Sequence, residues 1–473
     1  MPRKLGINLN SAPPFSTASG GIMGADADGP ELPATNGHVD SPLLTVCLCG
    51  GGNAAHASAA WLGQRKKNIA VNVFTRQPSK WKKQLTLHTR LSSWSHLGDV
   101  VGEVKKVSAD AAEVISSADV CLICAPAYAH LQLLRQVRDH LKRGAIVGTV
   151  FGQGGFDWAV THTFSSNAAA REKLGGFFAL QNLPWLCRLT AYGSAADLTA
   201  AKAYINVAVA PARVAHRVQL LIGMLFDIPC NLLPNFLSIT LSPSNQIIHP
   251  ARVYSIFRKW DGNTPLKDTD MQWGLYSDFD ECAAEWLEKL SEELQQIKRA
   301  LESRFPGLDL SAVLPIKERV IKHYGSDVED TTSLLTVFRS NRGYAAIRTP
   351  ALAVPGGFVP DLSDRLLCED IPYGLCVLKD LAEQLKLATP SIDFLIEWHQ
   401  KLLKKEFIRK GKLVPESLPE TSCARAYGLT SLEQIVAPSL LAQTNISSFI
   451  TAVAKDEEKE RRETEEAEEE QDG

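Results

Sequence analysis

The sequence predicts an α/β domain with a parallel sheet, followed by a mainly α-helical domain. Three observations lead to this prediction. An apolar strand at 44–49 ends in three glycines and is followed by an alanine-rich helix at 53–64. Apolar strands and amphipathic helices then alternate as far as about residue 234, which is the pattern of βαβ units. Beyond that point the periodic segments are long and helical, at 281–304, 314–324, 374–387 and 391–406.

Composition narrows the class of protein. With 473 residues, of which 45% are hydrophobic and 22% charged, the chain has the profile of a soluble protein of two to three domains. It contains no apolar run of the roughly 20 residues that a membrane helix needs, and its start lacks a signal-peptide core. No basic stripe with interleaved aromatic residues suggests nucleic acid as a partner. We therefore expect a cytoplasmic protein that contacts neither membrane nor nucleic acid.

Cysteine spacing does not indicate a metal site. The chain has ten cysteines, which is ordinary usage for its length and fits reduced thiols. Cys121 and Cys124 have CxxC spacing, but they fall in a predicted buried strand and no second CxxC or histidine pair accompanies them. We expect no bound metal.

The sequence predicts that the chain has four parts. Residues 1–42, rich in Gly, Ala, Pro and Ser, are expected to form a flexible extension. Residues 43–234 form the predicted dinucleotide-binding domain and 235–452 the helical substrate domain. The end, 453–473, is an acidic tail expected to be disordered, because Asp456–Gly473 holds eleven acidic and three basic residues.

The glycine turn has the spacing of a dinucleotide fingerprint, Gly50-x-Gly52-x-x-Ala55. Gly50 permits the tight turn, Gly52 lets the backbone approach a pyrophosphate, and Ala55 lets the helix lie close to the strand. The N–H groups of the helix start, near Asn53, favour phosphate. The turn thus predicts a Rossmann-type domain, with a plain glycine turn as the alternative.

The end of the second strand, 69–74, bears on the choice of cofactor. Sites that prefer NAD usually place a carboxylate there, whereas an arginine accommodates a 2′-phosphate. This chain has Thr75 and Arg76, with Lys80 close by and no carboxylate at the strand end. The pattern favours NADP(H) over NAD(H), unless Arg76 is merely a solvated loop cation.

Two later loops are predicted to border the ligand crevice. A strand at 119–125 leads into Pro126 and a loop of small residues, which would lie at the carboxyl end of a central strand. A strand at 145–150 leads into a second glycine-rich loop, 151–157, predicted beside the nicotinamide and substrate. A plain loop that needs a positive φ is an equal alternative for the second loop.

Two segments of the helical part carry candidate catalytic residues. The run 242–250 is predicted to begin a helix, on which Asn245 and His249 are four residues apart and share one face. His249 would overlook the cleft between the domains, although a core histidine is the usual alternative. Asp370 precedes Pro372 and an apolar run, so it could simply be an N-cap.

Taken together, these segments resemble the opine dehydrogenase family, also called the octopine/nopaline dehydrogenase family. The matching motifs occur in family order across about 43–410: GGGNxAH at 50–56, LPWxCR at 183–188, NxxxHP at 245–250, GFVPD at 357–361, RxxxEDxPYG at 365–374 and TPxID at 389–393. One departure is Trp185, where the family commonly has Tyr.

The resemblance implies a Rossmann domain joined to a helical domain, with substrates bound between them. It also implies an NAD(P)-dependent oxidoreductase that joins the amine of an amino acid to the carbonyl of a 2-oxo acid, commonly pyruvate. The family's catalytic histidine maps onto His249, its carboxylate partner onto Asp370 and its substrate-carboxylate arginine onto Arg365, while Asn245 belongs to the substrate site. Asp157 is a further candidate, to hold the amino group.

These roles make chemical sense. Hydride delivery to a carbonyl or imine carbon must be accompanied by a proton, which His249 can donate near neutral pH if Asp370 orients its ring. The fork of an arginine matches a carboxylate, which suits Arg365 to an oxo-acid anion.

Two other functions stay open. A simple 2-oxo-acid or ketone reductase of the same two-domain superfamily would normally use a lysine as proton donor, and Lys202 falls in a predicted β-region, which disfavours it. A non-catalytic NADP-binding sensor, with the acidic tail as its partner site, is the second alternative.

Overall fold

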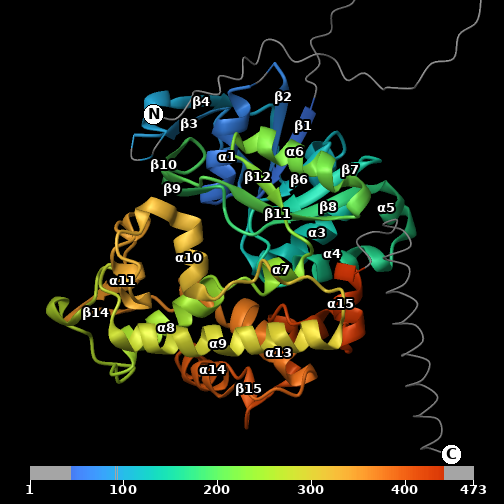
Figure 1. Cartoon of the computed structure of the whole chain (residues 1–473). Coiled ribbons are helices and arrows are strands. Elements are labelled where there is room, and N and C mark those ends of the chain that lie inside the picture. The colour runs from blue at the N-terminus through green and yellow to red at the C-terminus, as the bar shows by residue number, and fades with distance from the viewer. Residues whose placement is uncertain (1–43, 66, 91, 93, 441–473) are drawn as a thin grey trace, which may run out of the picture. The chain divides into compact units, whose positions relative to one another are not determined.

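The computed structural model describes residues 44–65, 67–90, 92 and 94–440 (Figure 1). The predicted N-terminal extension and acidic tail lie outside the described residues. Within them, no helix has the combination of length and apolar character that spanning a bilayer would take.

An eight-stranded sheet forms the N-terminal part, with the strand order β12-β11-β8-β7-β6-β1-β2-β5. Six of its strands run parallel, as predicted, whereas β11 runs antiparallel to β8 and β12 follows the direction of β11. The sheet is therefore mixed. Its strands are β1 (Leu44–Cys49), β2 (Ile69–Phe74), β5 (Lys106–Ser108), β6 (Val120–Ile123), β7 (Ala145–Thr149), β8 (Leu174–Leu180), β11 (Ile205–Ala210) and β12 (Cys230–Leu232).

β1 occupies the point at which the chain changes direction across the sheet. It pairs with β2 on one side and with β6 on the other, so the connections leave it toward opposite edges. Ligands of open α/β sheets bind at the carboxyl end of the strands at such a switch point. The glycine turn that follows β1 is therefore in the expected place for a cofactor.

Both faces of this sheet are covered, because successive side chains of a strand point to opposite sides. Cys47 and Cys49 join one buried cluster with α2, α3 and α4, whereas Val46 and Leu48 join another with α1 and α6. The helices of this part are α1 (Asn53–Gly63), α2 (Ala111–Ile115), α3 (His130–Arg138), α4 (Phe156–Ser165), α5 (Ala168–Lys173) and α6 (Ala215–Phe226).

A second, four-stranded sheet packs on α1 and was not predicted. Its order is β4-β3-β10-β9, formed by β3 (Gln84–His88), β4 (Val100–Glu103), β9 (Trp185–Ala191) and β10 (Ala195–Ala201). β4 approaches the helix so closely that a Cβ on Gly102 would lie 2.1 Å from the carbonyl oxygen of Ala60. β9 is an edge strand.

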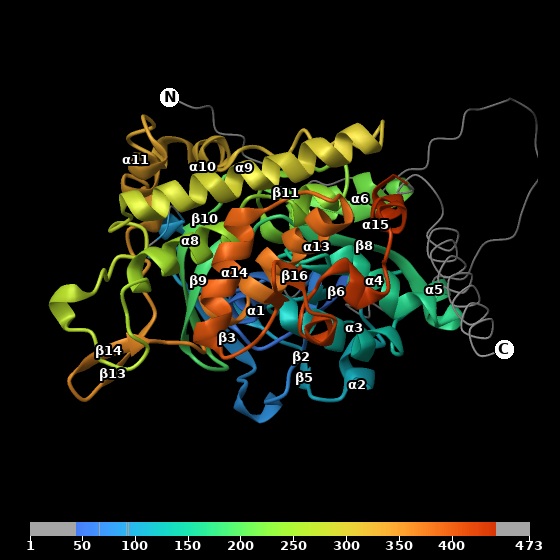
Figure 2. The ribbon, with the colours of Figure 1, turned by 90° about the horizontal axis from the view of Figure 1, so that it is seen from below.

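The C-terminal part is mainly helical, as predicted. The helix predicted at 281–304 is α9 (Glu281–Arg304), capped by the Asp280 side chain, which accepts the Ala283 N–H. Its buried side chains recur every three to four residues, which is the pattern of a helix with one apolar face. Figure 2 shows α8, α13 and α14 beside α9, in agreement with the contacts among these helices.

The other elements of this part are short. The predicted helix at 374–387 is instead a π-helical turn, Ile371–Leu375, followed by α13 (Cys376–Gln384). The remaining helices are α7 (Leu237–Thr240), α8 (Asn245–Phe257), α10 (Ile316–Tyr324), α11 (Leu334–Arg339), α12 (Arg365–Cys368), α14 (Pro390–Leu403) and α15 (Leu432–Leu440). Two hairpins join β13 (Ala351–Val354) to β14 (Gly357–Pro360) and β15 (Ile408–Arg409) to β16 (Lys412–Leu413).

Candidate active site

The glycines of the turn after β1 have different surroundings. Gly50 has φ of +147°, and a Cβ there would lie 2.4 Å from the carbonyl oxygen of Cys124, so the fold itself requires glycine. A Cβ on Gly52 would meet nothing within 4 Å. The backbone at Gly52 therefore faces open space at the start of α1, where the first helical N–H groups have no intrahelical acceptor.

This open space belongs to a cavity of about 220 Å³. Its walls are the glycine turn, the loop at Pro126, Phe151, β9 and the start of α12, and they are largely apolar. Three charged side chains reach it: Arg188, Arg365 and Glu369. A helix N-terminus beside an apolar slot fits the pyrophosphate and nicotinamide of a dinucleotide.

The other predicted cofactor residues surround the same turn. The Asn53 side chain accepts the Leu189 N–H at 2.9 Å, which fastens edge strand β9 to the start of α1. Ala55 is fully buried, and Thr75 is buried with its hydroxyl beneath Gly51. Arg76 is exposed at the end of β2, and Pro126 lines the cavity. Their roles as cofactor ligands remain predictions.

His249 and Asp370 form a buried pair, although they are 121 residues apart in the chain. The His249 Nδ1 lies 2.7 Å from the Asp370 Oδ2. Gly374 permits this approach of α8 to the π-helical turn, because a Cβ there would lie 2.6 Å from the Gln246 Cβ. Asp370 does stand at the N-cap position of the π-helical turn, but its carboxylate forms no cap hydrogen bond there and binds His249 instead.

Two residues that the sequence did not single out complete the pair. Gln153 donates its Nε2–H to the Asp370 Oδ1 at 3.1 Å, and the hydroxyl of Tyr276 lies 2.8 Å from the His249 Nε2. A carboxylate only accepts hydrogen bonds, so Nδ1 of His249 carries its hydrogen and Nε2 of the neutral ring accepts that of Tyr276. Gln153 lies in the predicted loop 151–157, but Tyr276 lies in an irregular segment without a sequence signal.

Glu369 connects the pair to the cavity. Its Oε1 accepts the Ala127 N–H at 2.7 Å, and its Oε2 lies 3.8 Å from an Arg365 nitrogen. Burial, and secondarily the charge of Asp370, raises the pKa of Glu369 to about 7. The cavity thus holds a carboxyl group that titrates near neutral pH.

The remaining substrate candidates have different positions. Arg365 is half-exposed and lines the cavity, as the predicted contact with a substrate carboxylate requires. Asn245 begins α8, one turn before His249, but is not among the residues that line this cavity. Its helix starts there without a side-chain cap, later than the predicted start at 242. Trp185 lines the cavity.

Two further sequence-based ideas concern residues outside the cavity. Asp157 lies in the first turn of α4, and burial raises its pKa to about 7. It is buried and, like His249 and Asp370, is not among the residues that line the cavity, so its role in holding a substrate amino group stays a prediction. Lys202 follows β10 and donates to the hydroxyl of Tyr324 at 3.0 Å.

The cysteines do not form a cluster with other ligands. Cys121 and Cys124 are buried and free. Among the described residues, no group of three or more His, Cys, Asp or Glu side chains is arranged to hold a metal ion.

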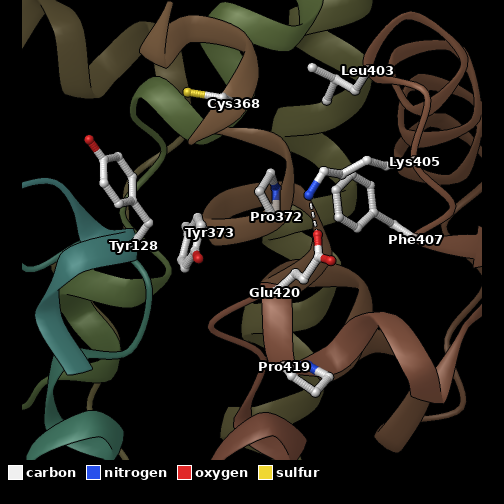
Figure 3. A pocket seen from close by; sticks show the side chains of 9 residues that line it. All are labelled: Tyr128, Cys368, Pro372, Tyr373, Leu403, Lys405, Phe407, Pro419 and Glu420. Carbon is white, nitrogen blue, oxygen red and sulfur yellow. Dashed lines mark hydrogen bonds and ion pairs between the residues drawn. The ribbon is translucent and has the colours of Figure 1, made fainter. Parts of the chain in front are cut away.

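A larger cavity, of about 500 Å³, lies beside Cys368 at the end of α12 (Figure 3). Its walls are aromatic, proline and aliphatic side chains, with an ion pair between Lys405 and Glu420. Figure 3 shows these two charged groups pointing toward each other, with Tyr128 on the opposite wall. None of the lining residues comes from the glycine turn or from the pair of His249 and Asp370.

Comparisons with known proteins agree with this architecture. Residues 232–403 match the family model of the NAD/NADP octopine/nopaline dehydrogenase alpha-helical domain. Tauropine dehydrogenase of Arabella iricolor is 29% identical over 408 residues, which is 83% of this chain and 100% of the relative. Octopine dehydrogenase of Pecten maximus is 28% identical over 406 residues, or 83% of this chain and 98% of the relative.

Solved structures extend the likeness to three dimensions. A structure of octopine dehydrogenase with NADH and L-arginine superposes with a TM-score of 0.73 at 27% identity, covering 85% of this chain and 99% of the other. A structure of octopine dehydrogenase with NADH and pyruvate gives a TM-score of 0.71 at 26% identity, with the same coverage. The fold, the nicotinamide dinucleotide cofactor and the class of enzyme follow. Residues 232–403 thus match an octopine/nopaline dehydrogenase alpha-helical domain, and over most of its length the chain is similar to tauropine and octopine dehydrogenases, which indicates an NAD(P)-dependent oxidoreductase of the opine dehydrogenase type.

Proposed function

We propose that the enzyme condenses an amino acid with a 2-oxo acid such as pyruvate and reduces the product to a secondary amine. The observation that carries this proposal is the buried His249–Asp370 pair, joined through Glu369 to a cavity at the glycine turn. Relatives that act on octopine and tauropine, and structures of octopine dehydrogenase with L-arginine or pyruvate, support this substrate class.

The reaction needs one group that can both donate and accept a proton and that can reach both substrates. The amine adds to the oxo-acid carbonyl, water leaves, and the imine takes up a hydride and a proton to become a secondary amine. Bound nicotinamide dinucleotide supplies the hydride. His249 fits the proton transfers, because Asp370 fixes Nδ1 and leaves Nε2 to exchange protons once its bond to Tyr276 is released.

Arg365 and Asn245 are proposed to bind substrate. Arg365 lines the cavity and can form two parallel hydrogen bonds to the carboxylate of the oxo acid. Asn245, one turn before His249 on α8, can donate to a substrate oxygen from the same side of the helix.

NADPH is proposed as the preferred cofactor because Arg76 is exposed at the end of β2 and no carboxylate stands there. Replacing Arg76 with Ala should raise the Kd of NADPH by about tenfold or more, since a charge-assisted contact contributes roughly 1.5–3 kcal/mol. The Kd of NADH should change far less. Equal effects on the two cofactors would remove the role in phosphate binding.

The proposed reaction is tested by following the oxidation of NADPH and NADH by the full chain. Pyruvate is combined with a panel of amino acids, and each compound is also tested alone. Oxidation that requires both an amino acid and pyruvate supports condensation. Oxidation with pyruvate alone would identify a simple reductase, and cofactor binding without any oxidation would favour a sensor; either result contradicts the proposal.

A further inference from the structure

The cavity at the glycine turn contains two guanidinium groups from different parts of the fold. Arg188 extends from edge strand β9, and Arg365 begins α12 in the helical part. A single oxo-acid carboxylate needs only one of them. Arg188 therefore has no role in the function proposed above.

Arg188 has no ionic partner within the described structure. Its only hydrogen bond is from Nη1 to the carbonyl oxygen of Cys187, at 3.3 Å. Asp197 faces it across the β9–β10 ladder, yet the two form no ion pair. Arg365, in contrast, lies 3.8 Å from Glu369. Arg188 is thus the less neutralised cation of the cavity, and its side chain is exposed to it.

The charge of Arg188 acts on two groups of the site, the thiol of Cys187 and the hydroxyl of Tyr276. Burial raises the pKa of the Cys187 thiol to about 11, and the charges of Arg188 and Arg365 act against this rise, so both lie near the same sulfur. Burial also raises the pKa of Tyr276, whose hydroxyl contacts His249, and the charge of Arg188 opposes this rise. Both guanidinium groups line the same cavity as Glu369, whose neighbour in the chain, Asp370, binds His249.

We propose that Arg188 binds the acid group of the amine substrate while Arg365 binds that of the oxo acid. This inference rests on the proposed condensation, whose product then carries one anionic group from each substrate. Two guanidinium groups, each able to form two hydrogen bonds, match such a dianion. The amine substrate is therefore an α-amino acid or an aminosulfonate, and a plain amine is a poor substrate.

The first test compares amines that differ only in the acid group. The full chain is assayed with pyruvate and L-alanine, L-arginine or taurine, and with ethylamine or agmatine, which lack the carboxylate. Arg188→Ala should raise the KM of the amino acid by about 10- to 150-fold, the range for a hydrogen bond to a charged group. The KM of pyruvate and the Kd of NADPH should stay within about twofold, and Arg188→Lys should restore part of the loss.

A binding measurement makes the test independent of turnover. Iminodiacetate, a secondary amine with two carboxylates, is titrated into the complex of the protein with NADPH, and sarcosine serves as the probe with one carboxylate. We expect iminodiacetate to bind more tightly than sarcosine, and Arg188→Ala to remove this advantage. Arg213→Ala is the matched control, because Arg213 is exposed on the same half of the chain and does not line the cavity.

Three results would overturn the proposal. Arg188→Ala could weaken NADPH instead, which would assign Arg188 to the cofactor pyrophosphate. It could raise the KM of an amino acid and of its decarboxylated counterpart equally, or iminodiacetate could bind no better than sarcosine. If the wild-type protein oxidises NADPH with no pair of substrates but binds iminodiacetate through Arg188, the condensation fails while the two-anion site stands.

Discussion

The two cavities beside α12 differ in what their walls can do. The larger one, of about 500 Å³, has walls of rings and aliphatic groups, and its two charged side chains, Lys405 and Glu420, neutralise each other. The smaller one, of about 220 Å³, has a helix N-terminus, two arginines and a titratable glutamate. Binding sites are recognised by converging polar groups with shifted pKa values, so the smaller cavity is the better candidate.

Three consecutive residues separate the two environments. Cys368 lines the larger cavity, Glu369 lines the smaller one, and Asp370 binds His249. The irregular backbone from α12 into the π-helical turn at 371 sends these neighbours in different directions. The chemistry of each cavity therefore depends on the direction of side chains within one short segment, and substitutions in either cavity test this conclusion.

The largest effect is expected at His249 and Asp370, the proposed catalytic pair. His249→Ala should lower kcat about 10²- to 10⁴-fold, the range for lost general acid–base catalysis, while the Kd of NADPH stays nearly unchanged. Steady-state kinetics and cofactor titration measure the two quantities. His216→Ala, on the exposed side of α6, is the control. Turnover close to wild type in the His249 variant would remove this residue from the mechanism.

The next effect concerns the glycine turn. Gly52→Val should raise the Kd of NADPH about tenfold or more, because the new side chain enters space that only a ligand would use. The Tm should change little, since nothing in the protein lies within 4 Å of the new Cβ. Gly50→Ala should instead lower the Tm, because its Cβ would overlap Cys124. An unchanged Kd in the Gly52 variant would place the cofactor elsewhere.

We expect the KM of the oxo acid to change several-fold with pH, because Glu369 lines the smaller cavity. The pKa of Glu369 is raised, so this side chain is neutral below about pH 7 and charged above it. Its charge neutralises Arg365 and repels an incoming carboxylate, so the KM of the oxo acid should rise as the pH increases through 7. Glu369→Gln should flatten this profile, whereas Cys368→Ser, one residue away, should leave it intact.

The same shift has a consequence for stability. A carboxyl group whose pKa is raised in the folded state stabilises the fold below its ordinary pKa, and this contribution is lost as the pH rises through about 7. Thermal unfolding at pH 5 and pH 8 should therefore show a smaller loss of Tm in Glu369→Gln than in the wild type. An equal loss in both proteins would contradict the assigned titration.

The smallest effect is expected in the larger cavity. Lys405→Met breaks the ion pair with Glu420, whose side chains are 50% and 57% exposed, so the loss of stability should be about 0–1 kcal/mol. Both kcat and the Kd of NADPH should stay within twofold. A tenfold change in either would show that the larger cavity takes part in catalysis.

Local patterns made part of the fold predictable. The strands at 44–49 and 69–74 and the helix at 281–304 have the predicted bounds, because each carries its own periodicity and end signals. The sheet on α1 was missed; its two local pairs, β3 with β4 and β9 with β10, are joined into one sheet by a distant pairing. β3 pairs with β10, more than 100 residues later, and neither strand has a pattern that reveals its partner.

The candidate site, like the fold, was only partly predictable from the sequence. Gly52, His249, Asp370 and Arg365 stand in motifs, so the resemblance located them, and the structure brings them to one region. The contact between His249 and Tyr276 comes from an irregular segment and is visible only in three dimensions. Asp157 was suggested by its place in a glycine-rich loop; the structure shows it buried in the first turn of α4, and its role stays a prediction.

The most direct test of the central claim is the mass of the product. The full chain is incubated with pyruvate, an ¹⁵N-labelled amino acid and NADPH deuterated at the transferable position, and the product is analysed by mass spectrometry. We predict one secondary amine that contains the ¹⁵N atom and one deuterium on the carbon derived from the pyruvate carbonyl, formed about 10²- to 10⁴-fold more slowly by His249→Ala. Deuterated lactate without ¹⁵N would contradict the account and identify a simple reductase.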